Sequence, residues 1–277
     1  MAGSGKSTLT HRLNVHCYQN SIDSYFINLD PAVANIQYGV NIDIRDTIDY
    51  KSVMRNHKIG PNSAILTCLN LFCTTFDKAI EFLEANACHS KYVFVDTPGQ
   101  IEVFTWSASG TIITEVLGST FPTTLLFTID SVRCTEDPHC FMSCILYATS
   151  IMYKTQLPMV LLFNKKDACE TKKLFEWMHD PKTFEEDMMK HSDSYASTLN
   201  RSLSVMLSEF YEAMRCLSIS SGTGDGLDEL FEAFDSCKLE YYDDYMPTRL
   251  KNVLKAEKKT QSQLADLEKA LTRTSME

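Results

Sequence analysis

Short apolar runs alternate with segments of helical periodicity along most of this chain. The apolar runs are continuous rather than mixed with polar residues, as is typical of strands that helices cover on both faces. We predict strands at 25–29, 92–95, 124–129, 159–163 and 216–219, and helices at 7–18, 64–86, 106–118, 140–154, 194–214 and 226–240. This order predicts an α/β fold with a mostly parallel sheet covered by helices on both faces.

The pattern changes after Pro247. Residues 248–277 are rich in charge and carry a broken apolar stripe at helical spacing. We therefore predict one domain over residues 1–247, followed by a charged helical extension at 248–277.

Composition narrows the classes of partner. The 277 residues carry a formal net charge of −10, which argues against a general nucleic-acid-binding or anionic membrane-binding surface. No apolar run has the length of a membrane-spanning helix, and the first residues lack the apolar core of a signal peptide. We expect a chain that is cytoplasmic or nuclear.

Ten cysteines are scattered through the predicted helices and strands, which favours reduced thiols over a disulfide framework. One cluster suggests a metal site, and it consists of Cys134, His139, Cys140 and Cys144. Its spacing matches no common zinc pattern, and its last two cysteines lie one turn apart in a predicted helix. The sequence therefore favours packed thiols here.

The first residues carry a phosphate-binding pattern. The second half of the phosphate loop G-x-x-x-x-G-K-[ST] is matched by Gly3-Ser4-Gly5-Lys6-Ser7-Thr8, and a predicted helix follows. Glycines let backbone N–H groups approach phosphate oxygens, and the helix directs its positive end at them. We expect Lys6 to contact the β- and γ-phosphates and Ser7 to ligate Mg²⁺. Read alone, the hexamer also fits a plain glycine- and serine-rich terminus.

A second motif follows the predicted strand at 92–95, and it reads Asp96-Thr97-Pro98-Gly99-Gln100. At a strand end beside the phosphate loop, Asp96 can hold Mg²⁺ through water, and Gln100 can orient the water that attacks the γ-phosphate. The same residues alone are typical of an ordinary turn. Their position after a phosphate loop favours the nucleotide site.

A third motif follows the predicted strand at 159–163, and it reads Asn164-Lys165-Lys166-Asp167, the pattern N-K-x-D. The carboxylate of Asp167 can accept hydrogen bonds from the ring N–H and the exocyclic amine of guanine, a donor pair that adenine lacks. We expect Asn164 to brace the base and the stem of Lys165 to cover its ring. Three motifs in this order predict a P-loop NTPase fold that binds GTP or GDP with Mg²⁺.

A weaker signal ends the last predicted strand. Ser220 and Ser221 precede a glycine-rich turn, where a backbone N–H can meet guanine O6. Such a turn before a helix is common, so the pattern indicates little by itself.

Further motifs give the chain a family resemblance. They are Asn28-Leu29-Asp30-Pro31-Ala32, Asn41-Ile42-Asp43-Ile44-Arg45-Asp46, Gly60-Pro61-Asn62, and the Asp96 motif continued by Ile101-Glu102. From Met1 to about Pro247 the chain closely resembles the GPN-loop GTPases. Two departures are Ser63-Ala64, where the family usually has a glycine after the loop, and a short or absent acidic tail. We expect a stiffer or differently aimed loop.

The resemblance implies a GTP-hydrolysing homodimer, or heterodimer with another GPN-loop GTPase, that serves the assembly and nuclear import of RNA polymerase II. It implies contact with polymerase subunits or assembly factors, no direct nucleic-acid contact, and a cytoplasmic protein that shuttles to the nucleus. It also implies that Asn62 of the loop Gly60-Pro61-Asn62 contacts a phosphate in the partner's site, and that Asp30 positions the catalytic water with Gln100. An amide donor can stabilise charge that develops on phosphate oxygens.

Three functions remain open: a GTP-hydrolysing switch, a non-hydrolysing assembly scaffold, and an ATP-dependent P-loop kinase or ligase. The N-K-x-D motif argues against the third. The sequence does not separate the first two.

The phosphate loop is incomplete at its start. Its first glycine would stand immediately before Met1, preceded by a central strand that feeds the loop. Four missing large apolar side chains remove about 6–12 kcal/mol, at roughly 1.5–3 kcal/mol each. That loss is comparable with the whole stability of a domain, about 5–15 kcal/mol. We expect the 277-residue chain to be marginally folded and to bind GTP poorly.

Overall fold

The structure is a computed structural model that describes residues 3–86, 90–191 and 214–252, together with the isolated positions 199, 202, 203, 206, 211, 254 and 255. Most of the helix predicted at 194–214 and most of the extension at 248–277 therefore lie outside the described residues. Residues 248–252, at the start of the extension, are helical.

The strands described by the structure form two separate three-stranded sheets rather than one. The first has the order β2 (Ile42–Asp43), β1 (Ser24–Asn28), β3 (Tyr92–Asp96), and the second β4 (Leu125–Asp130), β5 (Met159–Asn164), β6 (Arg215–Ser218). All pairs are parallel, and the last residues of neighbouring strands lie opposite one another, as Asn28 does with Asp96 and Asp130 with Asn164. The motif residues at strand ends therefore share one edge of each sheet.

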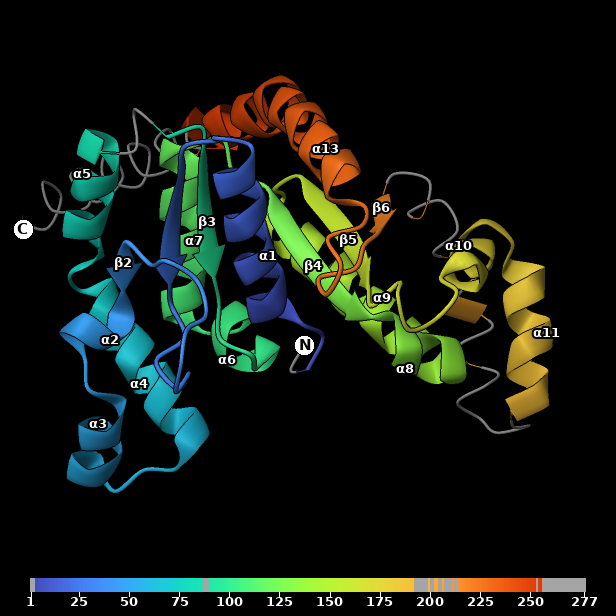
Figure 1. The fold of residues 1–277 in the computed structure, drawn as a ribbon, viewed down its shortest axis with the longest axis horizontal. Coiled ribbons are helices and arrows are strands. Elements are labelled where there is room, and N and C mark those ends of the chain that lie inside the picture. Colours follow the sequence, from blue (N-terminus) through green and yellow to red (C-terminus); the bar gives the residue numbers. More distant parts are fainter. Residues whose placement is uncertain are drawn as a thin grey trace, which may run out of the picture.

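Helices cover both faces of each sheet, as the sequence predicts (Figure 1). One face of both sheets is covered by α1 (Lys6–Gln19) and α13 (Leu227–Glu240). The other face of the first sheet packs against α4 (Pro61–Cys73), α5 (Phe76–Asn86) and α7 (Ala108–Thr120). The other face of the second sheet packs against α9 (Pro138–Thr155), α10 (Lys172–His179) and α11 (Pro181–His191). Shorter elements are α2 (Ile44–Thr47), α3 (Tyr50–His57), α6 (Ile101–Thr105), α8 (Ser131–Glu136) and the π-helical turn η2 (Tyr241–Tyr245).

Local chemistry explains where the helices depart from the predicted ranges. The predicted helix at 64–86 is interrupted because the hydroxyls of Thr74 and Thr75 donate to the carbonyls of Leu71 and Phe72 and end α4. The predicted helix at 106–118 begins instead at a cap, where the Ser107 hydroxyl accepts from the N–H of Gly110. The helices α10 and α11 and the two-residue strand β2 were not predicted.

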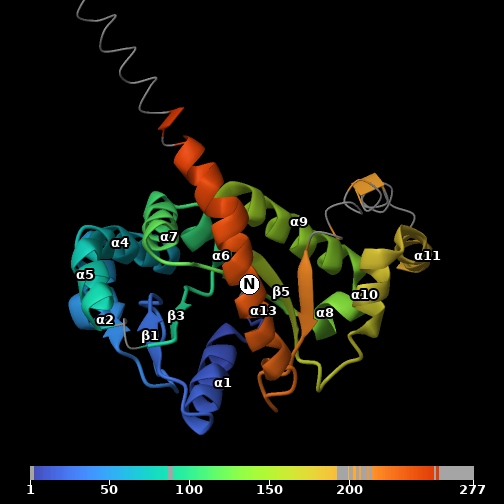
Figure 2. The same ribbon diagram turned by 90° about the horizontal axis from the view of Figure 1, so that it is seen from above.

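One apolar cluster joins the two sheets. Leu9 and Leu13 of α1 and Leu230 of α13 pack against Phe94 of the first sheet and Leu162 of the second. Figure 2 shows α13 lying across the region between the sheets. Two further clusters lie on the opposite faces, one under each sheet. The sheets are therefore held together mainly through the helices on one shared face.

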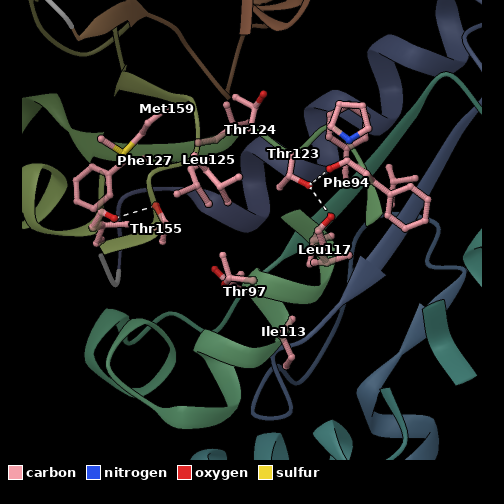
Figure 3. Close-up of a pocket in the computed structure, with 18 of the residues that line it drawn as sticks. Phe94, Thr97, Ile113, Leu117, Thr123, Thr124, Leu125, Phe127, Thr155 and Met159 are labelled. Atoms are coloured by element: carbon pink, nitrogen blue, oxygen red, sulfur yellow. Dashed lines mark hydrogen bonds between the residues drawn. The ribbon is translucent and has the colours of Figure 1, made fainter. Parts of the chain in front are cut away.

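A cavity of about 980 Å³ lies between the sheets and is lined by both β3 and β4. In the described residues, each of these strands has a ladder partner on one edge only. Figure 3 shows apolar side chains around it, among them Phe94, Ile113 and Leu117 from the first half and Leu125, Phe127 and Met159 from the second. A cavity with apolar walls between two unpaired strand edges can accommodate one more parallel strand. In the described residues β3 and β4 thus do not pair with each other, and the loss of stability expected at the phosphate loop stays a prediction.

The cavity leads to a stability prediction. We define the extended chain as residues 1–277 preceded by a five-residue apolar strand and a glycine. Filling the cavity should raise the free energy of unfolding by about 6–12 kcal/mol, since four large apolar side chains become buried. Urea unfolding followed by circular dichroism measures this difference.

A control extension replaces the apolar residues of the added strand with serine and glycine, and it should restore little stability. Equal unfolding midpoints for the 277-residue chain, the control and the extended chain would show that the cavity does not accommodate a strand.

Candidate nucleotide site

The phosphate-loop residues form a tight turn into α1. Gly3 and Gly5 have φ values of 79° and 90°, a left-handed backbone that side chains with a Cβ rarely adopt. A Cβ added to Gly5 would lie 2.5 Å from the side-chain nitrogen of Asn164. Glycine is therefore required here for both conformation and space, and the helix N-terminus that follows is suited to anions.

Lys6, Ser7 and Asp96 come together at the start of α1 and the end of β3. Burial lowers the pKa of Lys6, and the nearby carboxylates of Asp96 and Asp30 oppose this shift. Asp96 is 5% exposed. Burial raises its pKa, while hydrogen bonds from Tyr38 and Ser7 act in the opposite direction. The sequence-predicted phosphate and metal groups thus share one buried, charged region.

A smaller cavity of about 200 Å³ is lined by Ser7, Thr8, Tyr38 and Asp96, among other residues. The Tyr38 hydroxyl donates to Oδ2 of Asp96 at 2.9 Å, and burial raises the pKa of Tyr38. A hydroxyl and a carboxylate beside this cavity are the oxygen ligands that Mg²⁺ prefers. The residues present therefore fit a magnesium ion, which Ser7 and Asp96 would hold.

Asp30 follows β1 on the same side of the first sheet. Its carboxylate accepts from the N–H of Ala32 at 2.9 Å, and its own N–H donates to the side chain of Asn28. Asn28 also donates to Asp43 at 2.9 Å, and Asp43 pairs with Arg45 at 2.6 Å. This network gives the family motifs around residues 28 and 43 a shared structural role.

The Gly-Pro-Asn loop forms the N-terminus of α4. Gly60 caps the helix in an extended conformation, Pro61 is its first residue, and the N–H of Ala64 donates to the carbonyl of Gly60. Nε2 of Gln100 donates to Oδ1 of Asn62 at 2.8 Å within the same chain. Ser63-Ala64 belongs to the first turn of α4, so the residues after the loop are helical, and a stiffer or differently aimed loop stays a prediction.

Asn164 connects the phosphate loop with the other loops of the site. Its side chain is 1% exposed, and Nδ2 donates to the carbonyl of Ser4 at 2.8 Å. Its Oδ1 accepts from the N–H of Lys165 at 2.8 Å and from both the N–H and the hydroxyl of Ser221, at 3.0 and 2.8 Å. A single buried amide therefore joins three segments that are far apart in the sequence.

The remaining residues of the N-K-x-D motif have distinct environments. Lys165 has a φ of 70°, and its Nζ pairs with Asp130 at 2.7 Å. Lys166 pairs with Asp225 at 3.0 Å in a more exposed setting. The hydroxyl of Ser220 donates to Oδ1 of Asp167. The carboxylate assigned to guanine is thus oriented by a neighbour that the sequence also singles out.

Ser220 and Ser221 use their backbone N–H groups within the protein. The N–H of Ser220 donates to the carbonyl of Asp225 at 3.0 Å, and that of Ser221 donates to Asn164. A contact from this segment to guanine O6 stays a prediction.

Sequence reasoning missed Arg12, Tyr38 and Asp130. Nε of Arg12 donates to the carbonyl of Ser221 at 3.3 Å, so α1 is tied to the base loop as well as to the phosphate loop. Arg12 and Ser221 are 209 residues apart in the chain. No local sequence pattern indicates the contact of Arg12 with Ser221 or the contact of Tyr38 with Asp96. Asp130 carries a usable signal, because it ends a buried strand as Asp96 does.

The fold and these motifs define a P-loop nucleotide-binding protein. A family model described as "Conserved hypothetical ATP binding protein" matches residues 1–239. GPN-loop GTPase 1 of Saccharomyces cerevisiae is 46% identical over 268 residues, which are 94% of this chain and 69% of that protein. The chain belongs to the GPN-loop GTPase family, and the resemblance inferred from its motifs is confirmed.

Two other relatives define the extent of the similarity. GPN-loop GTPase 1 of Dictyostelium discoideum is 50% identical over 245 residues, 88% of this chain but 61% of that protein, so the chain spans about three fifths of its length. A crystal structure of a GTPase in apo form from Pyrococcus abyssi matches with a TM-score of 0.74 at 23% identity, over 88% of this chain and 95% of that one. The latter supports the predicted α/β P-loop fold.

None of the helices described in the structure is long and apolar enough to span a bilayer.

The orientation of Asp167 leads to a prediction on base selectivity. In the extended chain, Asp167→Asn should weaken GTP binding by about 2–4 kcal/mol and favour xanthosine triphosphate, because an amide offers a donor where guanine needs acceptors. Calorimetric titration with both nucleotides measures this.

Asp225→Asn is the matched control, since Asp225 is an exposed carboxylate that pairs with Lys166, and it should leave GTP affinity nearly unchanged. If Asp167→Asn binds GTP as tightly as the parent and gains nothing for xanthosine triphosphate, the assignment of Asp167 is wrong.

Proposed function

We propose that this protein binds GTP with Mg²⁺ and hydrolyses it, with weaker binding in the 277-residue chain than in the extended chain, and that it acts as a dimeric switch in the assembly and nuclear import of RNA polymerase II. The observation that carries the nucleotide part is the buried hydrogen bond between Asn164 and the carbonyl of Ser4. It ties the guanine motif to the phosphate loop, as a single ligand spanning both would require. Family membership supports the same activity.

The charged groups suggest how hydrolysis proceeds. Lys6 offsets negative charge on the β- and γ-phosphates, and Gln100 orients the water that attacks the γ-phosphorus. The bond to the bridging oxygen then breaks, which leaves GDP and inorganic phosphate. Ser7 and Asp96 would hold Mg²⁺, which would supply further charge neutralisation.

Asn62 and Asp30 have supporting roles in this proposal. Asn62 contacts Gln100 in the same chain, so one residue of the Gly-Pro-Asn loop already lies beside the water-orienting side chain. Its amide can donate to phosphate oxygens and stabilise developing charge. In a dimer the loop of one subunit would complete the site of the other, while Asp30 helps to place the water.

A second candidate is a scaffold that binds nucleotide without turnover. The observation that favours it is the cavity between β3 and β4, which reaches Lys6 and Asp96. Because this cavity separates the two sheets, the site can lose the precise geometry that hydrolysis needs. The surfaces that bind partner proteins can remain intact. Steady GTP turnover by the 277-residue chain would exclude the scaffold.

The catalytic assignment leads to a kinetic prediction. In the extended chain, Gln100→Leu and Asn62→Ala should each slow GTP hydrolysis by roughly 100-fold while nucleotide affinity changes little, since both side chains act mainly on the transition state. Single-turnover phosphate release and equilibrium GTP binding measure the two quantities separately.

Ser63→Ala is the control, because Ser63 is the next residue of α4 and has an exposed side chain. Mixing Asn62→Ala with a subunit that carries the parent loop and an inactive nucleotide site should restore hydrolysis. Full activity of Asn62→Ala as a monomer would contradict the shared site.

A further inference from the structure

Three cysteine sulfurs meet where α8 joins α9. Sγ of Cys134 lies 3.7 Å from that of Cys144 and 4.0 Å from that of Cys140, and all three lie within 4.8 Å of one another. Cys134 and Cys144 are buried, and Cys140 is partly exposed. His139, from the same sequence cluster, is not part of this group. These separations are far longer than a disulfide bond of about 2.05 Å.

The corner between the helices produces this arrangement. Asp137 ends α8 and caps α9 by accepting from the N–H of His139 at 2.9 Å, and Pro138 is the first residue of α9. The abrupt change of direction turns Cys134 back onto the face of α9 that carries Cys140 and Cys144, one turn apart. The spacing of these residues matches no common zinc pattern because the corner, rather than a loop, brings the sulfurs together.

We propose that Cys134, Cys140 and Cys144 bind one thiophilic cation, Zn²⁺, with a water molecule in the fourth position. Three sulfurs at about 2.3 Å from one tetrahedral ion lie about 3.8 Å apart. The separations from Cys134 to Cys144 and to Cys140, 3.7 and 4.0 Å, are close to this value, and the third separation, at most 4.8 Å, requires a side-chain rearrangement. Cys140 reaches the surface and provides a path of entry and a place for the water.

Charge balance agrees with a cation at this position. Metal binding replaces the thiol protons, which pass to solvent, and the ion offsets the charge of the buried thiolates.

The site would brace the base-binding region. It lies on α8 and α9, directly after β4, whose last residue Asp130 pairs with Lys165 of the guanine motif. A bound ion would hold α8 against α9 and would thereby restrict movement of the end of β4. The proposal stands on the cluster alone and does not depend on GTP binding.

The test uses Co²⁺ as a spectroscopic probe of the reduced 277-residue chain, with the extended chain measured alongside. We expect one equivalent of Co²⁺ to give an intense sulfur-to-cobalt absorption band that Zn²⁺ abolishes. Cys140→Ser, which changes a partly exposed side chain, and Cys134→Ala should each weaken Co²⁺ binding at least tenfold. Cys73→Ser on α4 is the matched control and should leave it unchanged.

A second readout is alkylation followed by mass spectrometry. Zn²⁺ should protect Cys140 from alkylation by at least tenfold while Cys73 stays equally reactive. No absorption band in either chain, a band that survives both cysteine variants, or equal alkylation of Cys140 with and without Zn²⁺ would each overturn the proposal.

Discussion

The candidate site depends on one buried amide, the side chain of Asn164. It donates to the phosphate loop at Ser4 and accepts from Lys165 and Ser221, so three loops take their positions from a single residue at the end of β5. Burial makes each lost bond costly, because an unsatisfied buried polar group costs about 1–3 kcal/mol. The same contact explains Gly5, since any side chain there would collide with the amide.

The residues of the nucleotide site come from both sheets, so the cavity between the sheets separates the two halves of the site. Asp96 ends a strand of the first sheet and Asp30 follows one, whereas Asn164 ends a strand of the second sheet and Asp167 follows it. The helices α1 and α13 join the sheets on one face, and Asn164 joins them at the site. Because β3 and β4 do not pair, the distance between the phosphate and base regions rests on these few connections. A strand in the cavity would make that distance a property of a continuous sheet.

Local sequence patterns predicted the strands and the nucleotide motifs, because both depend on residues that are close together in the chain. Continuous apolar runs located five strands to within about a residue. Two of the three nucleotide motifs were recognised at strand ends, and the phosphate loop was recognised by its glycine-lysine-serine pattern before a helix. Contacts between distant residues were not predictable, as for Tyr38 with Asp96 and Arg12 with Ser221, because nothing in either segment refers to the other. The approach of the three thiols was not predictable for the same reason, because spacing along a chain does not reveal a corner between two helices.

We propose that both sheets together form a guanine-selective site with Asn164 as their link. Competition between Mg²⁺-loaded GTP and ATP for the extended chain, measured at equilibrium, tests it most directly. GTP should bind at least about 100-fold more tightly than ATP, since ATP would leave the carboxylate of Asp167 without its donor pair. Equal affinity for ATP and GTP would contradict it.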